Sequence, residues 1–266
     1  MRAMLRKRSW LVLVLPLMLA ACEPVKAAGD DDGDGGSDPD GGRDPDANGD
    51  HPDGMVDAGG GIDAALKRDV RWLASNGLPD HACAPWTSVD TAQPEDGVIA
   101  PEGYLLVTSD PDAETLFYQQ TQNLLEAPAD GKLVLQARAR FIEGRASSSA
   151  RSGAHLGFVM GGKANTLFFE NGNVFLLAAE STRGAERAMT TEVFHNYRIE
   201  VDLHASAGTN NISVLQDGAV LISGRTFAAA AGTPDVIYFG DSTQNARATS
   251  HWLSVEHNAH VPVACP

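Results

Sequence analysis

The chain has 266 residues, a formal net charge of −15 and only three cysteines. An acidic chain without a block of basic residues argues against a nucleic acid partner and against electrostatic docking on an anionic membrane. Three cysteines are too few for a disulfide-rich scaffold, and their positions lack the spacing of a zinc site.

The first 21 residues are typical of an export signal. Four basic residues among the first eight precede an apolar run, residues 10–20, that is too short to span a bilayer. The run ends in Leu19-Ala20-Ala21-Cys22, which resembles the lipobox of bacterial lipoproteins. The resemblance implies cleavage before Cys22 and a protein held outside the cytoplasm by N-terminal acyl chains, with the outer membrane or cell surface as the preferred place. The alternative is an ordinary secretory signal in which Cys22 has no role.

Residues 22–62 are dominated by Gly, Asp and Pro and predict a disordered tether. Residues 22–64 hold 13 acids against two bases, so most of the acidity of the mature chain lies here. Repulsion between like charges extends such a segment and holds a folded domain away from the membrane. Residues 44–50 resemble the first half of an EF-hand calcium loop. Met55 stands where that loop needs a bidentate Glu, so a solvated linker is favoured.

Residues 63–86 predict a short helix followed by a lead-in segment. Asp63 is a suitable N-cap, and Asn76-Gly77 ends the pattern. We expect Trp72 and Trp86 to pack this segment onto the domain that follows. The apolar stripe of the predicted helix consists of Leu66, Val70 and Leu73.

From residue 87 the hydrophobic pattern has a period of two, which predicts one all-β domain over residues 87–266. Asn171-Gly172 and Asp217-Gly218 each separate two apolar runs and predict tight hairpins. Many short strands without a long helical pattern predict a two-sheet antiparallel sandwich. The predicted strands are residues 104–108, 116–118, 132–141, 155–160, 166–170, 173–178, 197–204, 211–215, 219–223, 236–239 and 250–257.

Cys83 and Cys265 stand at the two ends of this domain. With Cys22 committed to lipid, they are an even pair in an oxidising compartment, and we expect a disulfide between them. The chain-entropy model gives an upper figure of about 5 kcal/mol for a loop of this length. The alternative is two free, buried thiols.

Four segments carry a family resemblance. They are residues 194–202 (FHNYRIEVD), 212–218 (ISVLQDG), 238–242 (YFGDS) and 252–255 (WLSV). The motifs in these segments and their order along the chain resemble concanavalin A-like lectin/glucanase domains, and among these the laminin-G-like jelly-roll group. The resemblance implies a two-sheet antiparallel jelly roll with one concave face, but it leaves the activity open because this fold hosts lectins, adhesive modules and glycosidases.

Glu200 and Asp202 are the candidate catalytic residues. Glucanases of the resembled superfamily carry E-[ILV]-D-x-(x)-E on one strand, with the first Glu as nucleophile and the last as acid/base. Strand alternation places Glu200, Asp202 and His204 on one face. His204 or Ala205 stands where the second Glu is needed for a retaining mechanism. The alternative is an ordinary half-exposed strand whose charges point outward.

A sugar-binding surface needs an exposed aromatic ring beside polar groups. Trp252 and Glu256 are the candidates, on one side of a predicted strand, although Trp252 fits a core position equally well. The polar loop of residues 143–153 carries Arg145 and Arg151, and it either rims a ligand groove or forms a hairpin tip.

The resemblance also allows a structural calcium ion at the rim of the sandwich. Asp217, Asp235 and Asp241 lie in or near predicted turns and are the candidate ligands. The alternative is that these residues shape the turns. No other cofactor is indicated.

These observations favour a lipid-anchored surface lipoprotein whose β-sandwich binds a carbohydrate or a surface protein without catalysis. The first alternative is a glycoside hydrolase that uses Glu200 and Asp202. The second alternative is a structural protein of the cell envelope.

Overall fold

The computed structural model describes residues 71–81, 86–90, 97–109, 116–121, 123–144, 153–170, 172–206, 209–241 and 248–259. Within these ranges no helix is long and apolar enough to cross a membrane. The predicted signal, the tether and most of the predicted first helix lie outside the described residues, and so do Cys22, Cys83, Cys265, Arg145 and Arg151.

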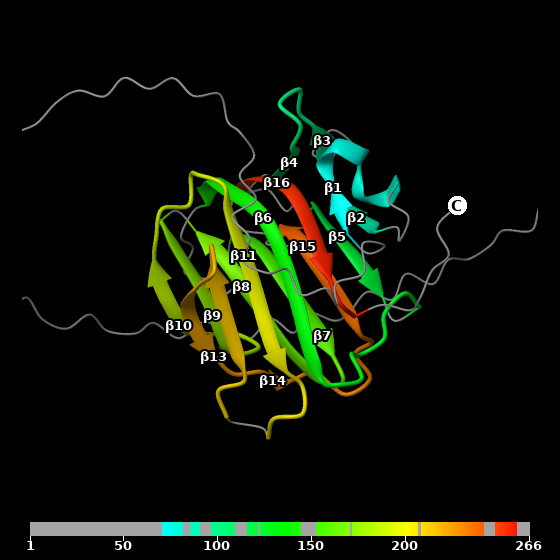
Figure 1. Ribbon diagram of the computed structural model, residues 1–266, viewed down its shortest axis with the longest axis vertical. Helices are drawn as coiled ribbons and strands as arrows, with labels where there is room; N and C mark the ends of the chain where they lie inside the picture. Colours follow the sequence, from blue (N-terminus) through cyan, green and yellow to red (C-terminus); the bar gives the residue numbers. More distant parts are fainter. Residues whose placement is uncertain are drawn as a thin grey trace, which may run out of the picture. The chain divides into compact units, whose positions relative to one another are not determined.

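The described residues form two antiparallel sheets that pack face to face (Figure 1). The first sheet has the strand order β13-β12-β11-β6-β16-β4-β3, with β1 paired to β16. Its strands are β1 (Trp72–Leu73), β3 (Gly97–Ile99), β4 (Leu105–Ser109), β6 (Lys132–Gly144), β11 (His195–Asp202), β12 (Ile212–Gln216), β13 (Ala219–Gly224) and β16 (Ala248–His257).

The second sheet has the order β10-β9-β8-β7-β15-β5-β2, with β14 paired to β8. The prediction of an all-β, two-sheet antiparallel jelly-roll sandwich is confirmed, and each predicted strand corresponds to a strand of the structure. The strands of the second sheet are β2 (Thr87–Asp90), β5 (Leu116–Thr121), β7 (Ala154–Met160), β8 (Lys163–Glu170), β9 (Asn173–Ala179), β10 (Thr182–Ala188), β14 (Phe227–Ala228) and β15 (Val236–Asp241).

The hairpin between β12 and β13 shows why the turn residues predict the register. Asp217 and Gly218 have φ angles of 49° and 86°. Positive φ at both central residues is the geometry of the tight turn whose twist matches that of the flanking strands. Gln216 therefore pairs with Ala219 and Leu215 with Val220. A shift of one residue at the next pair then places Val214 opposite Ile222, and both of these side chains are buried.

Aromatic side chains fill the centre of the sandwich. Phe239 of β15 is stacked on Trp72 at 5.7 Å between ring centroids and meets Trp86 edge-on at 5.0 Å. The expectation that these two tryptophans pack the lead-in segment onto the domain is confirmed. Trp252 lies 5.0 Å from the same ring and is fully buried, and its indole N–H donates to Ser250 Oγ. The hypothesis that Trp252 is an exposed sugar platform is therefore wrong, and the alternative, a core position, holds.

The lead-in segment contains a short strand and two 3₁₀ helices, but no α-helix, where the structure describes it. Trp72 and Leu73 form β1, which pairs with Val255 and Ser254 of β16. A 3₁₀ helix, η2 (Ala74–Asn76), follows and ends at Gly77, as the Asn-Gly signal predicts. A second, η3 (Pro79–His81), precedes β2. At Trp72 and Leu73, pairing to the sheet prevails over the local helical pattern, whereas the preceding part of the predicted helix lies outside the described residues.

A β-bulge in β16 changes which side chains face outward. Trp252 pairs with Ala139 but Ser254 pairs with Arg138, so one extra residue, Leu253, is inserted. Trp252 therefore faces the core, whereas Glu256, opposite Gln136, lies on the outer face. The prediction that Trp252 and Glu256 share one side of the strand is wrong for this reason.

Candidate functional site

The outer face of the second sheet carries a row of aromatic side chains that crosses several strands. Cross-strand pairing places Phe168 beside both His155 and Phe175. The centroid of the His155 ring lies 6.3 Å from that of Phe117 and 5.8 Å from that of Phe168, and Phe168 is stacked on Phe175 at 5.2 Å. We call this set, together with Tyr238, the aromatic row: Phe117, His155, Phe168, Phe175 and Tyr238.

Tyr238 lies flat on the sheet because the residue opposite it is a glycine. A Cβ built at Gly157 would approach the Tyr238 ring to 2.6 Å, so only glycine leaves room for the ring there. The Tyr238 hydroxyl is 2.7 Å from Thr166 Oγ1, and its ring meets His155 edge-on at 5.3 Å. The sheet thus fixes the position of one aromatic ring and one hydroxyl.

His155 is a neutral base enclosed by this row. Its side chain is fully buried, and among the described residues neither ring nitrogen has a hydrogen-bond partner. Burial lowers the pKa of His155 to about 3, and the backbone carbonyl of Gly153 opposes this only in part. An unpaired polar group in an apolar setting costs stability, so His155 is unusual for a residue with only a packing role.

The accessible end of the row consists of Phe117, Gln119 and Tyr238. All three side chains are half-buried, and Gln119 pairs with Tyr238 across the strands while standing two residues from Phe117. Two hydrophobic surfaces with an amide between them match the apolar face and the hydroxyl rim of a sugar.

The other end of the row is covered. The Arg183 guanidinium lies 4.1 Å from the centroid of the Phe175 ring and is ion-paired with Glu170, and Phe227 packs on the same cluster. Beyond it, at the edge between β9 and β10, an open depression of about 620 Å³ is lined by Asn173, Glu186, Arg187 and Ala188.

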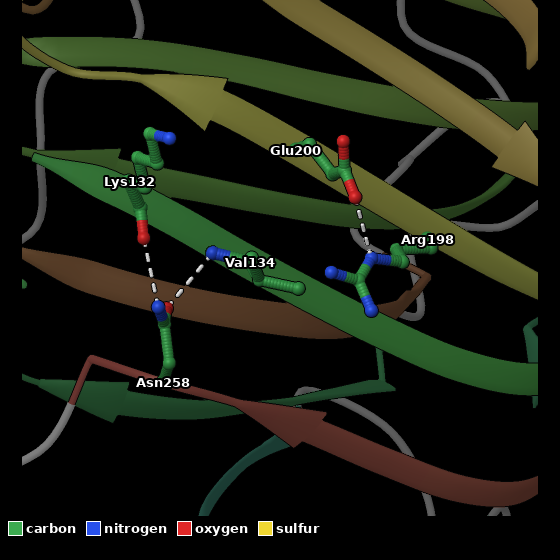
Figure 2. A network of polar contacts seen from close by, with 5 residues as sticks. All are labelled: Lys132, Val134, Arg198, Glu200 and Asn258. Atoms are coloured by element: carbon green, nitrogen blue, oxygen red, sulfur yellow. Dashed lines mark hydrogen bonds and ion pairs between the residues drawn. The ribbon is translucent and has the colours of Figure 1, made fainter. Parts of the chain in front are cut away.

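The candidate catalytic residues lie on the opposite side, on the outer face of the first sheet. The Arg198 Nε–H donates to Glu200 Oε1 at 2.7 Å, and the Glu200 side chain is 43% exposed (Figure 2). Cross-strand pairing places Val134 and Ser213 beside Glu200, and neither is an acid. Figure 2 also shows Asn258, whose amide accepts from the Val134 N–H and donates to the Lys132 carbonyl.

Asp202 organises a turn. Its Oδ1 accepts the backbone N–H groups of His204 at 2.8 Å and Ala205 at 3.1 Å. The Lys163 ammonium donates to the carbonyls of Leu203 and Ala205 from the other sheet, which holds this turn in place. The residues that replace the second Glu of the glucanase pattern therefore belong to a fixed turn.

Glu256 is a largely buried carboxyl on the same outer face. Arg71 lies 3.7 Å from Glu256 Oε2, and the Glu256 side chain is 8% exposed. Burial raises the pKa of Glu256, and the charges of Arg71 and Arg198 oppose that shift. Glu256 is thus more easily protonated than a solvated Glu, although it does not neighbour Trp252 as the sequence predicted.

The three candidate calcium ligands have separate structural roles. Asp217 accepts the Asn196 N–H, Asp235 accepts the Gly161 N–H, and buried Asp241 accepts the Ser109 hydroxyl. Within the described residues no group of three His, Cys, Asp or Glu side chains is arranged to hold a metal ion. The described positions of these three residues agree with the alternative, in which they shape turns and strand ends.

The fold defines the chain as a jelly-roll β-sandwich. Similar solved structures include the Emp47p carbohydrate recognition domain, 13% identical, which covers 76% of this chain and 100% of its own with a TM-score of 0.45. A carbohydrate esterase from the Shiga toxin-encoding bacteriophage phi24B is 10% identical, with coverages of 74% and 100% and a TM-score of 0.48. A Bacillus licheniformis β-glucanase is 10% identical, with coverages of 72% and 99% and a TM-score of 0.41. No protein-family model and no curated protein matches the chain.

The aromatic row is a site that sequence reasoning missed. The alternation of Leu116 and Tyr118 with Phe117 and Gln119 was the available signal, since it predicts that the two pairs face opposite ways. Position on a strand cannot show which outward residues of several strands lie in one row, and the pairing of β5, β15, β7, β8 and β9 supplies that information.

Proposed function

We propose that this protein is a lipid-anchored, extracytoplasmic lipoprotein whose sandwich recognises a carbohydrate without catalysis. The observation that carries the proposal is the accessible end of the aromatic row, where Phe117 and Tyr238 are the two residues next to Gln119 on the outer face of the second sheet. Sugars present an apolar face and directional hydroxyls, and such a surface offers stacking and hydrogen bonding together.

The rigidity of the site supports recognition. Tyr238 is held by Gly157 beneath its ring and by Thr166 at its hydroxyl, so little side-chain entropy is lost when a ligand binds. The depression beside Glu186 is a separate opening, because the buried residues His155, Phe168 and Phe175 lie between it and the accessible end of the row.

The state of the carboxylates supports a role without catalysis. Glu200 is paired with Arg198, and the carboxylate of Asp202 accepts two backbone N–H groups. A retaining glycosidase needs two carboxyl groups about 5–5.5 Å apart and free to act on one bond. The residues beside Glu200 on the outer face supply no such partner.

The experiment is a glycan array probed with the mature chain, residues 22–266, in detergent, followed by a hydrolysis assay on each bound oligosaccharide. We expect binding without turnover. Phe117→Ala should lose most of the signal, whereas Val220→Ala, which truncates a side chain that is 64% exposed on the first sheet, should keep it. Equal losses in both variants, or no bound glycan, would reject the carbohydrate ligand and leave a structural envelope role.

A glycoside hydrolase is the second candidate, and Glu256 is the observation that favours it. Glu200 is an arginine-paired carboxylate while burial raises the pKa of Glu256, and carboxyls of differing pKa on one face suit acid and nucleophile roles. Turnover that disappears in Glu200→Gln, with glycan binding retained, would establish this candidate in place of the first.

The anchor is tested separately, because it rests on the lipobox resemblance at Cys22. Two or three acyl chains give stable membrane attachment, whereas a cleaved secretory protein is released. We expect Cys22→Ser to move the protein from the membrane fraction to the soluble fraction. Membrane association that survives this substitution would refute the anchor without affecting the glycan result.

A further inference from the structure

The outer face of the first sheet holds a preorganised arginine. The Arg140 guanidinium lies 4.7 Å from the centroid of the Phe194 ring and 5.4 Å from that of Tyr104, within the range of cation–π contacts. Its Nε–H donates to His251 Nδ1 at 2.9 Å. His251 is in turn stacked on Tyr104 at 4.1 Å, so three side chains fix the plane of the guanidinium.

This arginine has no acidic partner among the described residues. Within the described part of the chain its Nε–H makes the one polar contact, and the two Nη groups, which form the outer fork of the guanidinium, have no polar partner there. Glu102 is close enough for its charge to act on His251, but it makes no ion pair with Arg140. Two residues along β6, Arg138 is exposed and likewise makes no ion pair with a described residue.

His251 holds Arg140 in its neutral form. Burial lowers the pKa of His251 to about 4, the Arg140 charge acts in the same direction, and Glu102 opposes both. Because Nδ1 accepts from Arg140, the ring hydrogen of neutral His251 is on Nε2. The cluster thus presents the Nη–H groups of Arg140 and the Nε2–H of His251 as donors, and it contains no acceptor for them.

Exposed apolar side chains surround this cluster. Val98 is 45% exposed and belongs to the same cross-strand row, since it pairs with Leu106, which pairs with His251. Ile142 is two residues beyond Arg140 on β6, and Val193 directly precedes Phe194. These three are among the four exposed large hydrophobic residues of the described chain. We call the whole surface the arginine patch: Val98, Tyr104, Arg140, Ile142, Val193, Phe194 and His251.

We infer that the arginine patch is a docking surface for an acidic peptide segment of a partner protein, in which a carboxylate binds the Arg140 fork and flanking apolar side chains cover Val98, Ile142 and Val193. The inference goes beyond the proposed glycan binding. Charge complementarity selects the carboxylate, because a fixed guanidinium fork binds it through two parallel hydrogen bonds.

The aliphatic rim selects a peptide over an acidic sugar. Aliphatic branches offer no flat face for a sugar ring to stack on, and the Tyr104 ring is already stacked on His251. Tyrosine and arginine are enriched in binding hot spots between proteins, and the contacts that surround a hot spot serve mainly to exclude water from it.

The test is an array of amidated heptapeptides with a central Glu flanked by Leu, Ile, Val or Phe, printed beside the same array with a central Gln. The mature chain in detergent is the probe. We expect binding to a subset of the Glu peptides, at least tenfold weaker binding to their Gln counterparts, and the same loss in Arg140→Lys, which keeps the charge but not the fork. Arg138→Gln, on the same strand, is the matched control and should keep more than half of the signal.

Thermal unfolding of Arg140→Lys checks that the sheet is intact, and we expect it to match the wild type. Equal binding of Glu and Gln peptides, or full retention in Arg140→Lys, would overturn the inference. A silent array would do the same. Stronger binding to a peptide of residues 29–62 than to every Glu peptide would also overturn it, because the chain's own tether would then be the occupant.

Discussion

The two outer faces of this sandwich are built by the same alternation of strands but carry different chemistry. On the first sheet, charged side chains dominate. The charges of Glu200 and Glu256 are balanced by Arg198, whereas the charge of Arg140 faces the neutral ring of His251. On the second sheet, aromatic rings enclose the neutral base His155. The inward positions of both sheets must be apolar to form the core, so they carry little information about function. The fold does not constrain the residue types of the outward positions, and functional residues are therefore sought there.

The largest expected effect concerns His155 and acid stability. Its pKa is about 3 in the folded protein and 6.5 in the unfolded chain, so between these values only the unfolded chain binds the proton. Stability is therefore complete above pH 6.5 and falls by about 1.4 kcal/mol per pH unit as the pH decreases, or roughly 4–5 kcal/mol by pH 3. Denaturant unfolding of wild type and His155→Leu across this range measures the difference.

His155→Leu should unfold with a shallower pH dependence and, at pH 7, should be at least as stable as the wild type because two unpaired ring nitrogens are removed. His204→Leu is the control, since it removes an exposed histidine and should keep the wild-type slope. An unchanged slope in His155→Leu would show that His155 is solvated or paired in solution.

The second effect tests the boundary between core and faces. Trp252→Ala should lower the free energy of unfolding by about 3–5 kcal/mol, because it empties a fully buried position beside Phe239. Phe117→Ala, on the half-exposed outer face, should cost less than half of this. If both substitutions cost the same, Trp252 is not a core residue and the aromatic platform has been assigned to the wrong sheet.

The smallest effect concerns the charged face. Glu200→Gln should change the free energy of unfolding by less than about 1 kcal/mol, since Glu200 is 43% exposed and an ion pair at such a surface contributes little. Thermal unfolding at low and high salt measures this. A loss above 2 kcal/mol would show that Glu200 is part of a buried network and that this face is not merely a solvated one.

The sequence predicted the fold because alternation and turn residues are local signals. Asp217-Gly218 and the apolar positions of β11 and β12 agree with one another, and the structure follows them. The edge strand β10 was missed because Thr182–Ala188 is polar and exposed, so it lacks the apolar alternation on which strand prediction depends.

The site was harder to predict because it depends on non-local facts. The bulge at Leu253 reverses the facing of Glu256, and the burial of Trp252 depends on Phe239 from the other sheet. His155 has no hydrogen-bond partner among the described residues because its neighbours across the strands are apolar, Phe168 among them. None of these can be read from one strand alone, whereas the alternation of β11 does place Glu200 and Asp202 on one outward face.

The most direct test of a functional difference between the two faces is one titration. The glycan that binds most tightly on the array is titrated into the wild type, Phe117→Ala and Arg140→Lys, and the three dissociation constants are compared. We predict that Phe117→Ala weakens binding at least tenfold while Arg140→Lys stays within twofold of the wild type. Weakening in Arg140→Lys equal to that in Phe117→Ala would contradict the assignment of glycan binding to the aromatic row.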